Sequence, residues 1–83
     1  MKDEEILVTV KEVISEELNV NLEKVREDSH LKNDLGADSL DMTRTIMELE
    51  DRFNIEIPME NFYMKEPTVS LVLAVVKNLL NSD

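Results

Sequence analysis

Apolar residues recur along the first part of the chain with the period of a helix. Between residues 3 and 18 they follow one another at three- and four-residue intervals: Ile6, Leu7, Val10, Val13, Ile14 and Leu18. This spacing gathers them on one face of an α-helix and leaves an acidic face outside. The acidic first turn suits the positive end of the helix dipole, and Asn19 suits a left-handed exit. We therefore predict an amphipathic helix over residues 3–18.

A second helical pattern covers residues 39–53, with Asp38 in the position of its N-cap. The face that we predict to be buried consists of Met42, Thr45, Ile46, Leu49 and Phe53. On another face, apolar and charged side chains are mixed: Leu40, Thr43 and Met47 lie among Asp41, Arg44, Glu48 and Asp51. Such a face is either a docking stripe for a partner or the ordinary scatter of apolar residues on a surface.

Two further segments follow Pro58, which forbids continuation of the second helix. Residues 59–67 are predicted to form a short helical turn that ends at Pro67. Thr68 then caps a final helix that extends to about Asn81. The apolar face of this helix consists of Val69, Val72, Val76 and Leu79, with Leu73 and Leu80 beside it.

A long connection joins the first two predicted helices, over residues 20–37. Its apolar residues, Leu22, Val25, Leu31 and Leu35, are spaced as anchors onto a core. Loops of this length are uncommon in compact domains and are usually either functional or disordered. The regular anchors favour an ordered, functional loop.

Composition supports an all-α fold. One Gly and two Pro in 83 residues are few for a β-rich protein, and strand patterns are scarce. The length suits a single domain over residues 1–83, and an apolar content of 42% suffices for its core. We predict a small four-helix bundle made of three main helices and one short helix. The absence of cysteine excludes disulfides, thiolate metal ligands and thiol nucleophiles.

The charge balance limits the kinds of partner. Nine Lys and Arg against nineteen Asp and Glu give a net charge of −10, which repels nucleic acid and anionic lipid. The same surface attracts proteins that carry Lys/Arg patches, at a rate that salt lowers. The apolar runs are too short to span a bilayer, and the acidic start resembles no targeting peptide. We expect a cytoplasmic monomer that binds neither nucleic acid nor membranes.

The chemistry of the chain centres on "GADSLDM", residues 36–42, where Ser39 is flanked by acids. Serine catalysis needs an adjacent base, and the single histidine, His30, lies in the connecting loop and is expected to be a solvated side chain. A calcium loop counted back from Gly36 would place Leu31 and Met42 at ligand positions, so no metal site is predicted. Neither catalysis nor metal binding therefore explains the serine.

Capping and attachment remain as explanations. Asp38 can accept a hydrogen bond from the backbone N–H of Leu40 or Asp41, which stabilises the helix by about 1 kcal/mol. That accounts for the aspartate and leaves the serine unexplained. Unpaired N–H groups and a partial positive charge at a helix start also suit a covalently attached phosphate. Gly36 and Ala37 would leave the Ser39 hydroxyl open to a modifying enzyme.

The segment "DLGADSLD", residues 34–41, resembles the attachment motif of acyl carrier proteins. The flanking segments "MELEDRFNIEIP" and "PTVSLVLAVVKNLL" resemble the second-helix exit and the last helix of that family, so the resemblance covers nearly the whole chain. It implies that a phosphopantetheinyl transferase attaches 4′-phosphopantetheine from coenzyme A to Ser39. The arm would then carry acyl groups as thioesters between fatty-acid or related biosynthetic enzymes, and the chain itself would catalyse nothing.

The same resemblance implies a set of recognition positions for transferase, acyl-transferring, synthase and ligase enzymes with basic docking patches. These positions are Asp38, Leu40, Asp41, Arg44, Met47 and Glu48. Arg44 departs from the pattern, because an acid is common there. It either changes which partners dock or forms an intrahelical pair with Glu48. Thr45 stands where Leu is usual. It either enlarges or reshapes an acyl cavity, or its hydroxyl bonds back to a helix carbonyl.

Residues 59–67, "MENFYMKEP", depart most from the family, with Phe62 and Tyr63 where short acidic residues are common. Together the departures suggest an alternative, a specialised carrier for polyketide or another unusual acyl group. An alternative of a different class is a non-carrier acidic helical adaptor, in which Asp38 and Ser39 only cap a helix.

Overall fold

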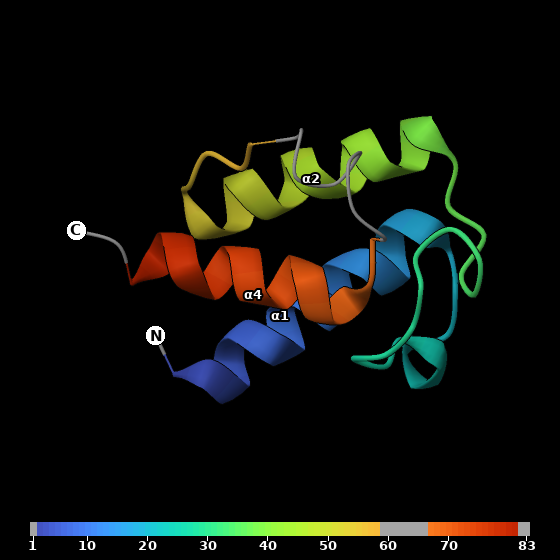
Figure 1. The fold of residues 1–83 in the computed structure, drawn as a ribbon, viewed down its shortest axis with the longest axis horizontal. Helices are drawn as coiled ribbons and strands as arrows, with labels where there is room; N and C mark the ends of the chain where they lie inside the picture. Colours follow the sequence, from blue (N-terminus) through green and yellow to red (C-terminus); the bar gives the residue numbers. More distant parts are fainter. Residues whose placement is uncertain (1, 59–66, 82–83) are drawn as a thin grey trace.

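Three α-helices dominate the computed structural model, which describes residues 2–58 and 67–81 (Figure 1). They are α1 (Asp3–Leu18), α2 (Ser39–Phe53) and α4 (Val69–Leu80), and a 3₁₀ turn, η1 (Leu22–Lys24), follows α1. No strand occurs within the described ranges, where the one β-type contact is an isolated bridge between His30 and Thr68. The predicted all-α class is confirmed. The short helical turn predicted for residues 59–67 lies outside the described residues, except for Pro67.

The helices pack through α1, which contacts both α2 and α4. In Figure 1, α1 runs from the end marked N toward the right, and α2 and α4 both return from right to left. One core joins the buried apolar side chains of the three helices and of the connection between α1 and α2. Burying one Val, Leu or Ile side chain contributes about 1.5–3 kcal/mol, so this core supplies most of the favourable free energy of folding.

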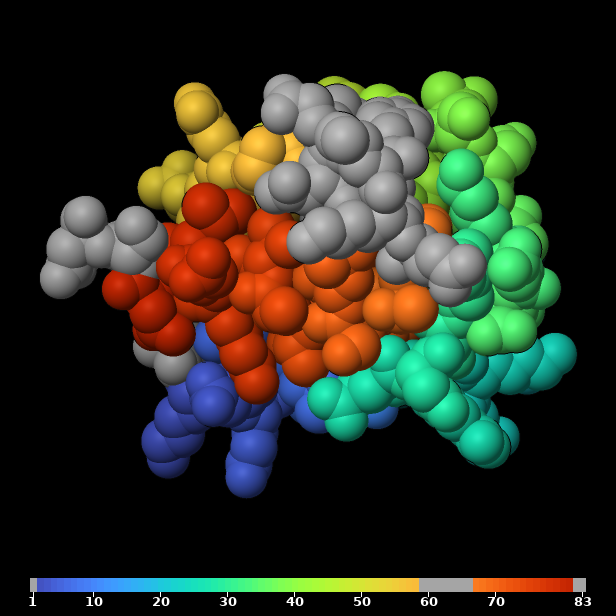
Figure 2. Space-filling model, viewed as in Figure 1, coloured from blue at the N-terminus to red at the C-terminus, as the bar shows by residue number. Residues whose placement is uncertain are grey.

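The predicted inner face of α2 is confirmed, since all five of its residues are buried: Met42, Thr45, Ile46, Leu49 and Phe53. Along α4, Val69, Val72, Leu73 and Val76 are buried, and Leu79 and Leu80 pack half-buried against the core. Figure 2 shows the side chains of α4 filling the middle of one face, with the connection packed beside the first turn of this helix.

Asparagine ends both long helices in the left-handed conformation. Asn19 has a φ of 53° and donates its backbone N–H to the Ser15 carbonyl, as predicted for the exit of α1. Asn54 does the same after α2, with a φ of 55° and a bond to the Glu50 carbonyl. The Glu50 side chain then accepts the backbone N–H of Ile57 at 2.8 Å. This bond folds the exit segment back onto α2.

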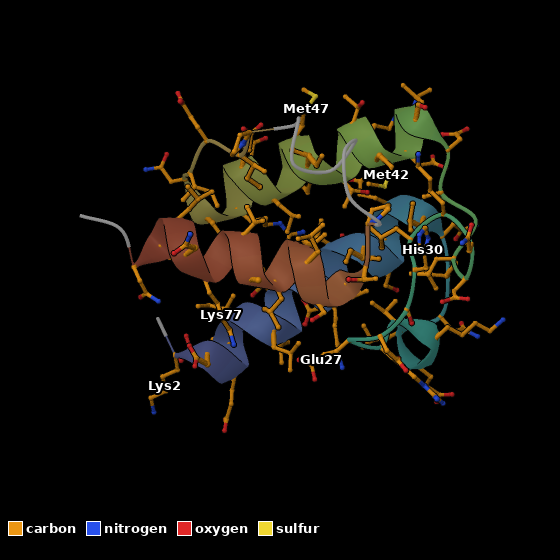
Figure 3. All side chains as sticks on the ribbon, viewed as in Figure 1. Lys2, Glu27, His30, Met42, Met47 and Lys77 are labelled. Atoms are coloured by element: carbon orange, nitrogen blue, oxygen red, sulfur yellow. The ribbon has the colours of Figure 1, made fainter. Side chains whose placement is uncertain are left out.

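The start of α4 has the predicted cap. The Thr68 hydroxyl accepts the backbone N–H of Leu71 at 3.1 Å. Farther along α4, the ammonium of Lys77 lies 3.9 Å from the Asp3 carboxylate at the start of α1. In Figure 3 Lys77 points from α4 toward the N-terminal end of α1.

The connection between α1 and α2 is ordered, as its apolar pattern predicted. Val25, Leu31 and Leu35 are buried in the core. Ser29 is buried too, and its hydroxyl accepts the Arg26 N–H and donates to the Lys24 carbonyl. No polar side-chain atom buried within the described residues lacks a partner.

The prediction that Leu22 anchors the connection is wrong, because this side chain is 50% exposed. It lies in the single turn of η1, directly after the chain leaves α1. Val20 before it packs half-buried against the core, and Val25 after it is fully buried. These two residues occupy the core positions on either side of the turn, so Leu22 remains outside.

Backbone hydrogen bonds fasten the connection to the start of α4. The Leu31 N–H donates to the Pro67 carbonyl at 2.7 Å, and the Val69 N–H donates to the Ser29 carbonyl at 3.0 Å. The Ser70 N–H adds a third bond, to the Glu27 carbonyl at 2.8 Å. Because the connection leads directly into α2, these bonds also fix where that helix begins.

Candidate attachment site and docking surface

Ser39 is the first residue of α2 and is exposed. Asp38 precedes it in extended conformation and caps the helix, since its Oδ1 accepts the Asp41 N–H at 2.8 Å. Asp41 returns the bond, because its Oδ2 accepts the Asp38 N–H at 3.2 Å. The sequence predicted the cap and missed the reciprocal bond. The reciprocal bond could have been predicted from Asp41, an acid three residues after the N-cap. This is the spacing of a capping box, with Asp in place of the usual Glu or Gln.

The backbone before Ser39 is held by side chains on both sides of a glycine. Leu35 and Ala37 are buried, and Gly36 between them is exposed with a φ of 75°. A Cβ built on Gly36 would meet no atom within 4 Å, so the space beside this residue is open. Since a side chain would have room here, the glycine is required for its left-handed backbone conformation.

His30 organises the turn that leads toward this glycine (Figure 3). Its Nδ1 accepts the backbone N–H groups of Lys32 at 3.2 Å and Asn33 at 3.0 Å. Its own backbone N–H donates to the Asp34 carboxylate at 2.7 Å. The sequence predicted only a solvated side chain here, so this structural role of a half-buried histidine is a finding of the tertiary structure.

The outer face of α2 carries two large exposed apolar side chains. Leu40 is 56% exposed and Met47 is 57% exposed. Figure 3 shows Met47 pointing away from the other helices, and Met42 pointing toward them. Arg44 is exposed as well and stands between Leu40 and Met47 along the helix. We call Leu40, Arg44 and Met47 the outer stripe of α2.

Arg52 joins α2 to α1. Its Nε donates to the Glu48 carboxylate at 3.3 Å, one turn earlier on α2, and its Nη2 donates to the Glu16 carboxylate on α1 at 3.4 Å. The alternative pairing of Arg44 with Glu48 is therefore wrong. Glu48 is one turn from both arginines, and Arg52 has the advantage of a second carboxylate across the helix contact.

Of the six predicted recognition residues, the structure leaves four exposed: Asp38, Leu40, Arg44 and Met47. The other two, Asp41 and Glu48, are half-buried. Asp38, Asp41 and Glu48 all use carboxylate oxygens in hydrogen bonds within the chain. The six residues therefore lie at the start and along the first turns of one helix, and their three carboxylates all make hydrogen bonds within the chain.

Thr45 is buried beneath this surface, and its hydroxyl donates to the Asp41 carbonyl at 2.8 Å. The predicted bond back to the helix is confirmed, so the polar side chain is satisfied inside the core. Across residues 2–58 and 67–81, no three His, Asp or Glu side chains gather as a metal site would need. Within the same ranges, no helix is long and apolar enough to cross a membrane.

Comparison with known proteins gives this arrangement a family. The chain matches the phosphopantetheine attachment site family over residues 8–76. It is 39% identical over 82 residues to the acyl carrier protein of Cyanidium caldarium, covering 95% of each chain. It is 52% identical over 60 residues to the acyl carrier protein of Prochlorococcus marinus, covering 72% of this chain and 75% of that one. The Wolinella succinogenes acyl carrier protein is 59% identical over 51 residues, 61% of this chain and 67% of its own.

The helical fold and the matched attachment domain define a phosphopantetheine-bearing carrier. The chain belongs to the acyl carrier protein family. The attachment domain indicates a covalently bound 4′-phosphopantetheine group. Proteins of this family are carriers, and they interact with a phosphopantetheinyl transferase and with biosynthetic enzymes.

Proposed function

We propose that the 4′-phosphopantetheine arm is attached to the Ser39 hydroxyl. The observation that carries the proposal is the place of this residue, exposed at the first position of α2 within the segment "DLGADSLD". Ser39 is exposed, and Gly36, three residues earlier, has open space beside it. Bound there, the arm would supply a terminal thiol that holds acyl groups as thioesters.

The start of α2 suits a phosphate. The backbone N–H of Asp41 is taken by the Asp38 side chain, and that of Met42 by the Asp38 carbonyl. Within the described residues, the N–H groups of Ser39 and Leu40 have no acceptor. Unpaired N–H groups and the positive end of the helix dipole favour an anion at this position. The negative charge of a phosphodiester on Ser39 therefore has compensation in the helix itself.

The chain's own residues hold and present the arm, and another protein supplies the catalysis. Asp38 and Asp41 fix the first turn of α2, and the buried Leu35 and Ala37 fix the backbone that leads into it. The lone histidine has its Nδ1 engaged by two backbone N–H groups in the turn before the site. A weakly nucleophilic serine suits this arrangement, because the transferase activates it.

The partners that fit this surface are a phosphopantetheinyl transferase and acyl-transferring, synthase and ligase enzymes with basic docking patches. They would meet Asp38, Leu40, Asp41, Arg44, Met47 and Glu48. The net charge of −10 supports such partners through long-range attraction.

We propose a single carrier domain over residues 1–83 that acts as a cytoplasmic monomer in fatty-acid or related biosynthesis. A second candidate is a specialised carrier for an unusual acyl group, because Arg44 is exposed at a position where the family commonly has an acid.

Mass spectrometry after incubation with coenzyme A and a broad-specificity transferase tests the proposal. The chain should gain the mass of one phosphopantetheine, and Ser39→Ala should gain nothing. Ser70→Ala is the matched control, because Ser70 is an exposed serine at the start of another helix. It should be modified as the unaltered chain is. A folded chain that stays unmodified with every donor and transferase would instead indicate the acidic adaptor.

A further inference from the structure

The two arginines of α2 differ in what surrounds them. Arg52 contacts two carboxylates, those of Glu48 and Glu16, so its charge is compensated within the chain. Arg44 is exposed and forms no ion pair with any residue in the described part of the chain. The two acidic residues one turn away along the helix are bonded elsewhere: the Asp41 carboxylate accepts the Asp38 N–H, and the Glu48 carboxylate is paired with Arg52. Among the described residues, Arg44 therefore presents a positive charge that no ion pair compensates.

This charge lies in the centre of the outer stripe. Arg44 follows Leu40 by four residues and precedes Met47 by three, so each apolar side chain is one helical turn away on the same face. Leu40 and Met47 are both more than half exposed. A partner that buries these two apolar side chains must also cover the guanidinium between them.

Three carboxylates near the stripe make hydrogen bonds within the chain. The carboxylates of Asp38 and Asp41 accept hydrogen bonds from each other's backbone, and the Glu48 carboxylate is paired with Arg52. A uniformly basic partner would still be drawn by the overall charge of −10. At contact, however, it would place a cation against Arg44, and it would gain less from Glu48, whose charge is already paired with Arg52. Like charges in contact lower affinity and so help to exclude such partners.

We propose that Arg44 is a specificity-determining residue: the partners that this carrier serves best present an Asp or Glu carboxylate opposite Arg44. The carboxylate lies between the apolar contacts for Leu40 and Met47, inside an otherwise basic docking patch. An arginine and a carboxylate can form a two-pronged hydrogen-bonded pair, which fixes the register of the docked helix. This inference rests on the proposed carrier function and adds the chemistry of the partner surface.

The first experiment measures how fast a broad-specificity transferase with a basic docking patch modifies the chain. R44E should raise kcat/KM about fivefold at low salt, and the gain should shrink as salt screens the contact. R44Q should fall between R44E and the unaltered chain. The matched control is R26E, the same change at an exposed arginine in the connection outside α2. It alters net charge equally and should change kcat/KM less than twofold.

The second experiment exchanges charges across the contact between Arg44 and the transferase. Each Lys or Arg of the transferase docking patch is replaced singly by Glu, and every variant is tested against the unaltered chain and R44E. At the position that faces Arg44, the replacement should speed modification of the unaltered chain about fivefold and slow that of R44E. Circular dichroism of each chain confirms that the helices are intact.

The outcomes separate the two proposals. If Ser39 is modified at the same rate in all Arg44 variants, with every transferase variant and at low salt, Arg44 has no role in specificity and the attachment site stands. If no variant is modified at all, the carrier function fails and the role of Arg44 fails with it. A charge exchange confined to one transferase position supports the proposed carboxylate.

Discussion

Asp38 and Asp41 each accept a hydrogen bond from the other's backbone N–H, at 2.8 and 3.2 Å, and Ser39 lies in the turn that these two bonds close. The pair therefore does more than begin a helix. It holds the first turn of α2 in one geometry while the serine hydroxyl remains exposed. A modifying enzyme meets a preformed surface, so little ordering is required when it docks.

Removing the cap should destabilise the chain. Asp38→Ala leaves the Asp41 N–H without its acceptor, and we expect the free energy of unfolding to fall by about 1 kcal/mol. Asp38→Asn is the matched variant, because its amide oxygen can still accept this bond, and it should lose only a small part of that amount. Urea denaturation followed by circular dichroism measures both. Equal losses in the two variants would show that charge, and not the cap bond, is what matters.

Gly36 should tolerate no Cβ without a conformational cost. Its φ of 75° lies in the left-handed region, and a Cβ there would touch nothing within 4 Å. Gly36→Ala should therefore lower stability by about 1–2 kcal/mol through backbone strain alone. Gly36→Asn should cost less, because asparagine adopts this conformation more readily, as Asn19 and Asn54 do in this chain. Thermal and urea unfolding of the two variants provide the comparison, and an alanine variant as stable as the parent would contradict it.

The connection offers a paired test of burial. Leu31 is 1% exposed and Leu22 is 50% exposed, although both are leucines of the same connection. Leu31→Ala should cost about 2–5 kcal/mol, because it removes transfer free energy and leaves a cavity. Leu22→Ala should stay within about 0.5 kcal/mol of the parent. If the two variants unfold at the same urea concentration, Leu22 is an anchor after all.

Salt should stabilise the chain. Its net charge of −10 makes the folded state repel itself, and dissolved ions screen that repulsion. We expect the melting temperature to rise as NaCl or a divalent cation is added, with the divalent cation effective at lower concentration. Differential scanning calorimetry over a salt series measures this. A melting temperature that responds to neither addition would contradict the expectation.

Local features of the fold could be predicted where the physics is local. The bounds of α1 and α2, the Asp38 and Thr68 caps and the left-handed Asn19 follow from helical periodicity and from side chains that bond their own backbone. The motif around Ser39 is likewise a run of adjacent residues. Such interactions reach only a few positions along the chain, so a sequence displays them directly.

The two wrong predictions concern residues that are distant in sequence or that had several possible partners. Glu48 could pair with Arg44 or Arg52, and Glu16 from α1 decided the outcome. Leu22 has an anchor's spacing, yet Val20 and Val25 fill the core beside it. The helical period of the sequence cannot decide between such alternatives, because their energies depend on which side chains the neighbouring element places nearby.

The sequence by itself determined the helices, their buried faces, the excess of negative charge and the presence of Ser39 at a helix start. Only the tertiary structure decided which charges on α2 are compensated, and which apolar residues of the connection remain outside. It also decided that backbone bonds from residues 27–31 to the start of α4 hold the connection in place. The physical reason is the same in each case: periodicity assigns a residue to a face, but packing between elements decides what that face meets.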